Sequence, residues 1–130
     1  MLDSPRLVVT GHDSDGKSVV ISDQAIPVTS VFGTAEVHQL WATKEGNGTG
    51  SQTDLSVVDF SPGSPGPETY EAVHYGIILE GELHMMVDET DTVLRPGDIL
   101  VQLGTTHQWE NRSEKNVRTV FVGVTGQVAR

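Results

Sequence analysis

The stretch that decides the fold is His74-Tyr75-Gly76-Ile77-Ile78-Leu79-Glu80-Gly81, which is followed by Arg95-Pro96-Gly97-Asp98 and then by Gly104-Thr105-Thr106-His107-Gln108-Trp109-Glu110-Asn111. Two short apolar runs each deliver a histidine, and a Gly or Pro-Gly turn lies on each side of them. Short strands separated by such turns are typical of a sheet or barrel. This arrangement can bring His74 and His107 to one place inside a small barrel, where imidazoles ligate a metal or exchange protons near neutral pH.

The rest of the chain has the same strand-and-turn character. No window of useful length shows helical periodicity, and the Gly, Asn, Thr and Pro-rich segments 44–53 and 61–67 are expected to be loops. About ten short strands at regular spacing predict an antiparallel sandwich or barrel. With 130 residues and no linker, the chain is expected to form one domain over residues 1–130. The expected strands are residues 6–10, 18–22, 28–32, 36–43, 55–60, 72–79, 82–87, 92–94, 98–102, 107–111 and 117–124.

Composition excludes several classes of function. The chain has no cysteine, so disulfides, thiolate nucleophiles and cysteine-ligated metals are ruled out. Its formal net charge of −10 argues against nucleic acid and anionic membranes as partners. No apolar run is long enough to span a bilayer and the first residues lack signal-peptide character, so we expect a cytoplasmic protein. A small molecule is the expected ligand.

The two motifs resemble those of the cupin superfamily, whose members are double-stranded β-helix or jelly-roll barrels. The first motif ends in the turn Leu79-Glu80-Gly81, and the second runs from Pro96-Gly97-Asp98 to a Gly-x-x-His-x-x-x-Asn pattern over Gly104 to Asn111. The resemblance therefore implies an all-β, antiparallel cupin-type jelly-roll barrel.

The metal-ligand pattern that this resemblance implies is incomplete. His107 matches a family ligand, whereas His74 stands where the family usually has its ligand glutamate. The two upstream histidine positions of the family fall near Glu68 and Tyr70. The resemblance thus implies a ligand set of His74, His107 and Glu68, with Tyr70 as an uncertain fourth member.

These residues support two kinds of chemistry. Two histidines and a carboxylate make up the facial triad that holds non-haem iron, and the same set suits manganese, nickel or zinc. Without a metal, His74, His107 and Glu68 can act as general acid and base, which covers dehydration, decarboxylation, isomerisation and cyclisation. The sequence leaves a divalent metal and no cofactor about equally open.

Further side chains are expected to line or to avoid the substrate pocket. His38 and Trp41 lie on the expected strand 36–43, and Trp109 lies on the same face as His107 if that segment is extended, so these three and Tyr70 are pocket candidates. His84 is expected to point away from its apolar neighbours, toward solvent or an interface. Alternation also predicts that one apolar set faces the barrel interior or an inter-sheet core. That set consists of Ile77, Leu79, Leu83, Met85 and Val87.

The N-terminal strands, within residues 1–25, precede the two motifs and have no obvious partner among the other expected strands. In this superfamily such strands often pair with the sheet of a second subunit, and an uncovered edge favours that arrangement. We expect a homodimer in which these strands are exchanged or packed at the interface.

Three functions follow, in order of preference. The first is an enzyme of a biosynthetic or catabolic pathway, of lyase or isomerase type, that acts on a small molecule by acid–base chemistry at His74 and His107. The second is a metal-dependent dioxygenase or lyase that uses His74, His107 and Glu68. The third is a ligand-binding barrel without catalysis, because fold does not fix function.

Overall fold

The computed structural model describes residues 3–41, 53–63 and 72–125, and within them the chain forms eleven β-strands and no helix. The expectation of an all-β fold is confirmed. Glu68 and Tyr70 lie outside the described residues. No helix that could cross a membrane is found in the described part of the chain. The strands are β1 (Arg6–His12), β2 (Ser18–Ala25), β3 (Ser30–Phe32), β4 (Ala35–Val37), β5 (Thr53–Phe60), β6 (Ala72–Glu80), β7 (Leu83–Met86), β8 (Asp91–Leu94), β9 (Ile99–Leu103), β10 (Gln108–Glu110) and β11 (Val117–Thr125).

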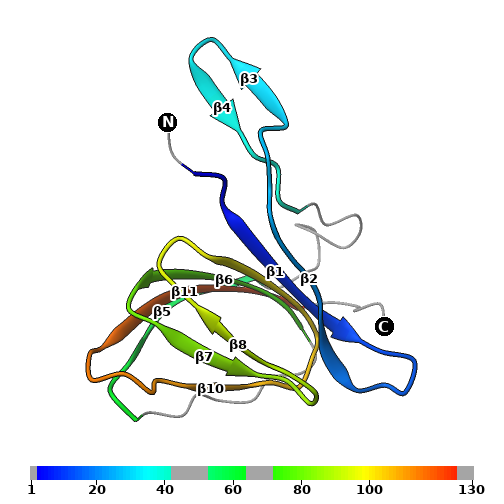
Figure 1. The fold of residues 1–130 in the computed structure, drawn as a ribbon, viewed down its shortest axis with the longest axis vertical. Helices are drawn as coiled ribbons and strands as arrows, with labels where there is room; N and C mark the ends of the chain where they lie inside the picture. Colours follow the sequence, from blue (N-terminus) through cyan, green and yellow to red (C-terminus); the bar gives the residue numbers. More distant parts are fainter. Residues whose placement is uncertain (1–2, 42–52, 64–71, 126–130) are drawn as a thin grey trace.

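Two sheets form the body of the molecule (Figure 1). The larger has six strands in the order β2-β1-β9-β6-β11-β5, and the smaller has three in the order β10-β7-β8. Between them lies a cluster of buried side chains, which hydrophobic burial stabilises. The larger sheet contributes Val8, Phe60, Ile78, Leu100 and Val117, and the smaller contributes Leu83, Met85, Leu94 and Trp109.

The N-terminal strands have partners within the same chain. The expected hairpin of β1 and β2 is present, and β1 also pairs in parallel with β9, from Leu7 opposite Ile99 to Thr10 opposite Gln102. This parallel pair corrects two expectations, that the sheet is antiparallel throughout and that these strands lack a partner. Sequence patterns do not reveal such a pairing because it joins segments about ninety residues apart, and parallel strands need a long crossover connection.

The register of β6 differs from the expected one by one residue. Ile78 is buried between the sheets, whereas Leu79 is 50% exposed on the outer face. Leu83 and Met85 of β7 do face the interior, as expected. The turn at Gly81 separates the two strands, so alternation cannot be continued through it, and a shift of one residue moves every side chain of a strand to the opposite face.

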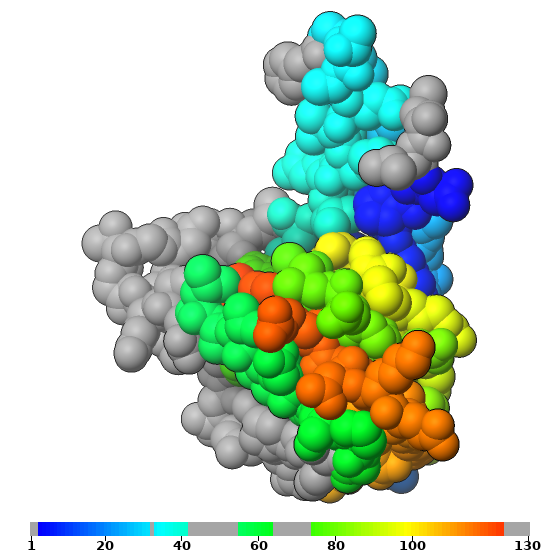
Figure 2. Space-filling model, turned by 90° about the vertical axis from the view of Figure 1, so that its left-hand side faces the viewer, coloured from blue at the N-terminus to red at the C-terminus, as the bar shows by residue number. Residues whose placement is uncertain are grey.

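The outer face of the larger sheet is partly covered by the segment around the β3–β4 hairpin. Ile26 and Leu40 pack against a second buried cluster formed by Leu7, Val9 and Val101. The hairpin itself stands out from the body (Figures 1 and 2). The strand expected over residues 36–43 ends at Val37, because the chain leaves the hairpin there and returns toward the sheet.

Asn111, the last residue of the second motif, has a structural role. Its side chain is fully buried, and its Nδ2 donates to the carbonyl oxygens of Phe60 and Lys115 at 2.9 and 2.7 Å. Its Oδ1 accepts from the backbone N–H and the hydroxyl of Ser113. Asn111 therefore closes the turn between β10 and β11 and ties it to the end of β5.

Candidate functional site

A row of polar side chains crosses the inner face of the larger sheet. In β9, Leu100 belongs to the cluster between the sheets and Val101 to the cluster on the outer face, so alternation places Gln102 inside. Gln102 is opposite Thr10 of β1 on one side and opposite His74 of β6 on the other. Thr10, Gln102 and His74 therefore form one row over three neighbouring strands.

The inward direction of His74 follows from its neighbour in the same strand. A Cβ added to Gly76 would meet the side chains of Phe121 and Leu100, at 3.0 and 3.6 Å, and both belong to the cluster between the sheets or pack against it. Gly76 thus faces the interior, and His74, two residues before it, faces the same way.

The row continues to His107 through a pair of threonines. The hydroxyls of Thr10 and Thr105 are 2.7 Å apart, and both residues are buried. The carbonyl oxygen of Thr105 lies 2.8 Å from Nδ1 of His107. A carbonyl only accepts, so Nδ1 carries the hydrogen and, in the neutral ring, Nε2 carries the lone pair. This tautomer suits both a general base and a metal ligand.

His107 is held against the core and next to a cavity. Its ring meets that of Trp109 edge-on with centroids 5.1 Å apart, and Trp109 in turn packs against Phe121 and Phe60. The expectation that Trp109 and His107 share a face is confirmed, but Trp109 is 3% exposed and is a core residue rather than a rim residue. A cavity of about 280 Å³ borders His107 and is lined also by Met86, Val87, Asp88, Thr106 and Gln108.

Two other pocket candidates lie on the far side of the larger sheet. His38 hydrogen-bonds through Nδ1 to the carbonyl oxygen of Ile26 at 2.7 Å, in the segment that covers the outer face. Trp41 is 39% exposed beside Leu40, which packs on that face. The structure therefore does not bring His38 and Trp41 together with His74 and His107. Their strand was expected to enter the barrel, but it ends before either residue.

The described residues fit a metal only in part. His107 presents the right tautomer and His74 faces the same interior, but among residues 3–41, 53–63 and 72–125 no group of three or more His, Asp or Glu side chains is placed to hold an ion. A triad would need a carboxylate such as Glu68, which lies outside the described residues.

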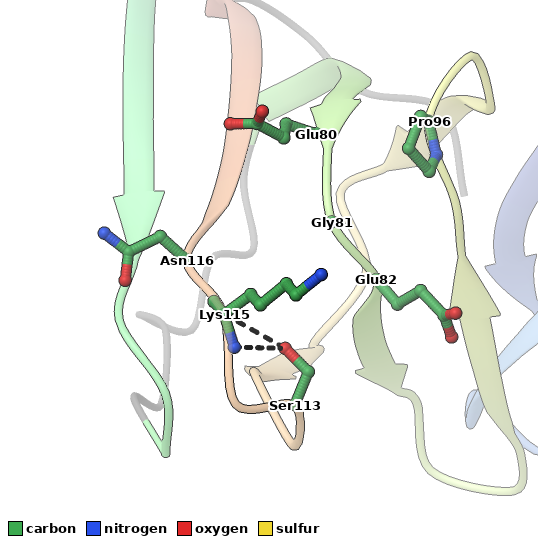
Figure 3. Close-up of a pocket in the computed structure, with 7 residues that line it drawn as sticks. All are labelled: Glu80, Gly81, Glu82, Pro96, Ser113, Lys115 and Asn116. Carbon is green, nitrogen blue, oxygen red and sulfur yellow. Dashed lines mark hydrogen bonds between the residues drawn. The ribbon is translucent and has the colours of Figure 1, made fainter.

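A second, larger hollow lies at the other end of the barrel (Figure 3). It has a volume of about 700 Å³ and lies between the turns at Gly81, Pro96 and Ser113, with Glu80, Glu82 and Lys115 around it. Glu80 is six residues from His74 along β6, about 20 Å at the usual rise of a strand. This hollow therefore belongs to a different part of the molecule from the histidine row.

Comparison with known families agrees with this fold. The family model described as a cupin domain matches residues 56–123, which include β6 to β10, most of β5 and β11, and both His74 and His107. The chain belongs to the cupin family.

The relatives of this cupin include proteins named for biosynthesis clusters and proteins named as oxidoreductases. It is 31% identical to the phomopsin biosynthesis cluster protein C' of Diaporthe leptostromiformis, over 93% of this chain and 78% of that protein. It is also 31% identical to the cupin-domain-containing oxidoreductase fogC of Aspergillus ruber, over 79% of this chain but only 62% of that protein. Among solved structures it resembles a sugar phosphate isomerase of the cupin superfamily from Silicibacter pomeroyi, with a TM-score of 0.53, 23% identity and coverage of 58% and 52% of the two chains, which shows the fold alone.

Sequence reasoning missed three members of the polar row of this cupin. All three are buried, with an exposed fraction of 1% or less: Thr10, Gln102 and Thr105. A signal was available for Gln102, which is a polar residue in the run Ile99 to Leu103 that is otherwise apolar. Thr10 had no such signal, because only the parallel pairing of β1 with β9 places it there.

Proposed function

We propose that this cupin is an enzyme of a biosynthetic pathway, of lyase or isomerase type, that transfers protons to and from a small molecule inside the barrel. The observation that carries the proposal is His107, whose Nδ1–H is fixed by the Thr105 carbonyl at 2.8 Å in a buried site. A general base needs a fixed orientation and a lone pair directed at its substrate. A relative named as a biosynthesis cluster protein supports a small molecule of a biosynthetic pathway as the substrate.

His74 supplies the complementary proton-transfer group in this proposal. It faces the same interior from β6, one strand away from Gln102. Imidazole is the side-chain group best suited to gain and lose a proton near neutral pH, so one ring removes a proton while the other returns one. Dehydration, decarboxylation, isomerisation and cyclisation all have this requirement.

The test uses carbon-bound protons that exchange with solvent. The protein, stripped with a chelator, is incubated in D₂O with acetylacetone and ethyl acetoacetate, and deuterium uptake at the central carbon is followed by NMR. We expect exchange faster than in buffer, and a loss of about 100-fold or more in His74→Ala and in His107→Ala, the usual scale for a general base. His84→Ala is the matched control, because His84 alternates with the inward-facing Leu83 and Met85 and lies on the outer face of β7. Unchanged exchange in the double variant His74→Ala/His107→Ala would refute the proposal.

A second candidate is a metal-dependent oxidoreductase, favoured by the name of the relative from Aspergillus ruber. His74 and His107, with Glu68, would hold the ion, and a divalent metal bound there would supply Lewis-acid or redox chemistry. Metal analysis before and after chelation separates the two candidates. Activity that follows iron, manganese, nickel or zinc content would favour the second one.

A further inference from the structure

Gln102 is a buried amide whose position packing does not explain. It is 1% exposed, and on the inner face of β9 its neighbour is the apolar Leu100. A leucine or methionine would fill the same space without an amide to satisfy. Burying an amide costs free energy unless its hydrogen-bonding groups find partners, so a buried glutamine needs an explanation.

The partner that Gln102 has is a weak one. Its Nε2 donates to Sδ of Met85, across the barrel on β7, at 3.3 Å. A thioether sulfur accepts hydrogen bonds poorly compared with an oxygen. Met85 therefore holds the amide in place. An oxygen atom of a ligand would be a stronger hydrogen-bond acceptor for the same Nε2 than the sulfur of Met85.

The position of Gln102 matches that of a substrate-binding group. Its cross-strand partner on one side is His74 and on the other is Thr10, whose hydroxyl leads through Thr105 to His107. The amide thus lies within the same row as both proposed proton-transfer groups. A ligand oxygen bound by Nε2 would place the adjacent carbon near the two imidazoles.

The charges of the buried side chains favour a neutral carbonyl compound over a carboxylate as the ligand. The buried polar side chains of the described residues include no lysine or arginine, and the one histidine among them, His107, is occupied by proton transfer in the proposed function. A carboxylate taken out of water needs a cationic or multiply donating partner. A neutral carbonyl needs only one or two donors, which an amide supplies.

We propose that Gln102 binds the carbonyl oxygen of a neutral ketone, aldehyde or ester, and that this protein selects such carbonyl compounds over carboxylates. The assignment rests on the proposed function, because proton removal next to a carbonyl is the reaction that a donor at that oxygen assists. A hydrogen bond to the oxygen strengthens as negative charge develops on it during deprotonation.

The test compares variants of Gln102 with acetylacetone labelled with ¹³C at its carbonyls. In the wild type we expect saturable binding, with the carbonyl ¹³C resonance displaced downfield by the hydrogen bond. Gln102→Met, which conserves volume and removes the donors, should weaken binding at least 10-fold and abolish the displacement. Gln24→Met on the exposed part of β2 is the control, and thermal unfolding shows which variants fold.

The outcomes separate this proposal from the one on which it rests. Wild-type affinity in Gln102→Met, no binding of acetylacetone by the wild type, or equal affinity for acetylacetone and acetate would each overturn the role of Gln102. His107→Ala should still bind the labelled probe while losing deuterium exchange. If Gln102→Met loses binding but His107→Ala keeps full exchange, the role of Gln102 stands and the proton-transfer function fails.

Discussion

At Gly81 the chain turns from β6 to β7 with a φ of 85°, a conformation that costs an L-residue about 1–2 kcal/mol. The space around it is also closed, because a Cβ there would lie 2.9 Å from the carbonyl oxygen of Asn116 and 2.8 Å from Cγ2 of Val117. Gly97, in the turn between β8 and β9, has a similar φ of 89° but nothing within 4 Å of the Cβ position. A substitution at Gly81 therefore introduces both backbone strain and a steric clash, whereas a substitution at Gly97 introduces backbone strain alone.

We expect Gly81→Ala to lower the free energy of unfolding by about 3 kcal/mol and Gly97→Ala by about 1 kcal/mol. The first variant carries both the strain and the clash with the β10–β11 turn, and the second carries the strain alone. Urea unfolding of both proteins measures the difference. Equal losses would mean that the turn at Asn116 moves aside without cost.

Arg6 makes four side-chain hydrogen bonds that join the N-terminal hairpin to the rest of the sheet. From β1 it bonds to Asp23 of β2 through Nε and Nη2, both at 2.8 Å, and through Nη1 to Asp98 at 2.7 Å and the Val93 carbonyl at 2.9 Å. These contacts fasten the N-terminal hairpin to the β8–β9 connection. The guanidinium also holds the pKa of the Asp23 carboxyl below its ordinary value of 3.8 through that hydrogen bond.

We expect Arg6→Leu to lower the free energy of unfolding at pH 7 by about 2 kcal/mol. This value is smaller than the sum for buried hydrogen bonds to a charged group, because solvent screens the partly exposed guanidinium. A carboxyl whose pKa is lowered by folding stabilises the folded state above its unfolded pKa and loses that effect as pH falls through the folded value. The gap between wild type and variant should therefore shrink below about pH 4. Urea titrations at several pH values measure it.

Arg95→Leu is the control for Arg6, because Arg95 is exposed and its ion pair to Glu82 is 3.9 Å long. Its loss should change the unfolding free energy by no more than about 0.5 kcal/mol. A gap for Arg6→Leu that stays constant down to pH 2 would show that Asp23 does not contribute.

The elements also show which features the sequence could predict. Strand positions followed from β-branched runs and Gly-Pro turns, so most strands of the sheets lie within two residues of the expected ones. His74 and His107 were found because each lies within a local motif. Thr10 was missed because its place in the row depends on the pairing of β1 with β9, which no local pattern encodes. Gln102 is marked locally as a polar residue in an apolar run, but its place beside His74 depends on the pairing of β9 with β6. The inward face of β6 was wrong by one residue, because alternation does not continue through the turn at Gly81.

On the scale of the whole molecule, two apolar surfaces have no cover in the described structure. The first is the part of the outer face of the larger sheet formed by β5 and β11, away from the part that the segment around the β3–β4 hairpin covers. It carries two cross-strand rows, Leu55 with Val122 and Val57 with Val120, and Leu55 and Val57 are 71% and 59% exposed. Asp59 and Arg118 pair at the end of these strands, so the face is bordered by neutralised charge. Such a face packs against another sheet in aligned sandwiches.

The second surface is the β3–β4 hairpin, which stands away from the body (Figure 2). Its Val31 is 60% exposed, and a two-stranded hairpin without a packing partner is marginally stable at best. A second copy of the chain can cover both surfaces at once. In a two-fold dimer each copy presents the same outer face and the same hairpin to its partner. We therefore expect a homodimer that buries the outer face and the hairpin.

Val57→Lys should convert this dimer to a monomer, because a lysine ammonium at the centre of the face would have to be buried without a partner. Light scattering measures the mass, and circular dichroism should show that the variant keeps its β-structure. Thr90→Lys, which adds the same charge at the exposed β7–β8 turn, should leave the dimer intact. Shortening the chain by β1 and β2 is a poorer test than Val57→Lys, because β1 forms part of the sheet through β9 and its loss would disturb each subunit. A wild-type protein that stays monomeric at high concentration would contradict the expectation, and the exposed valines and leucines would then need another partner.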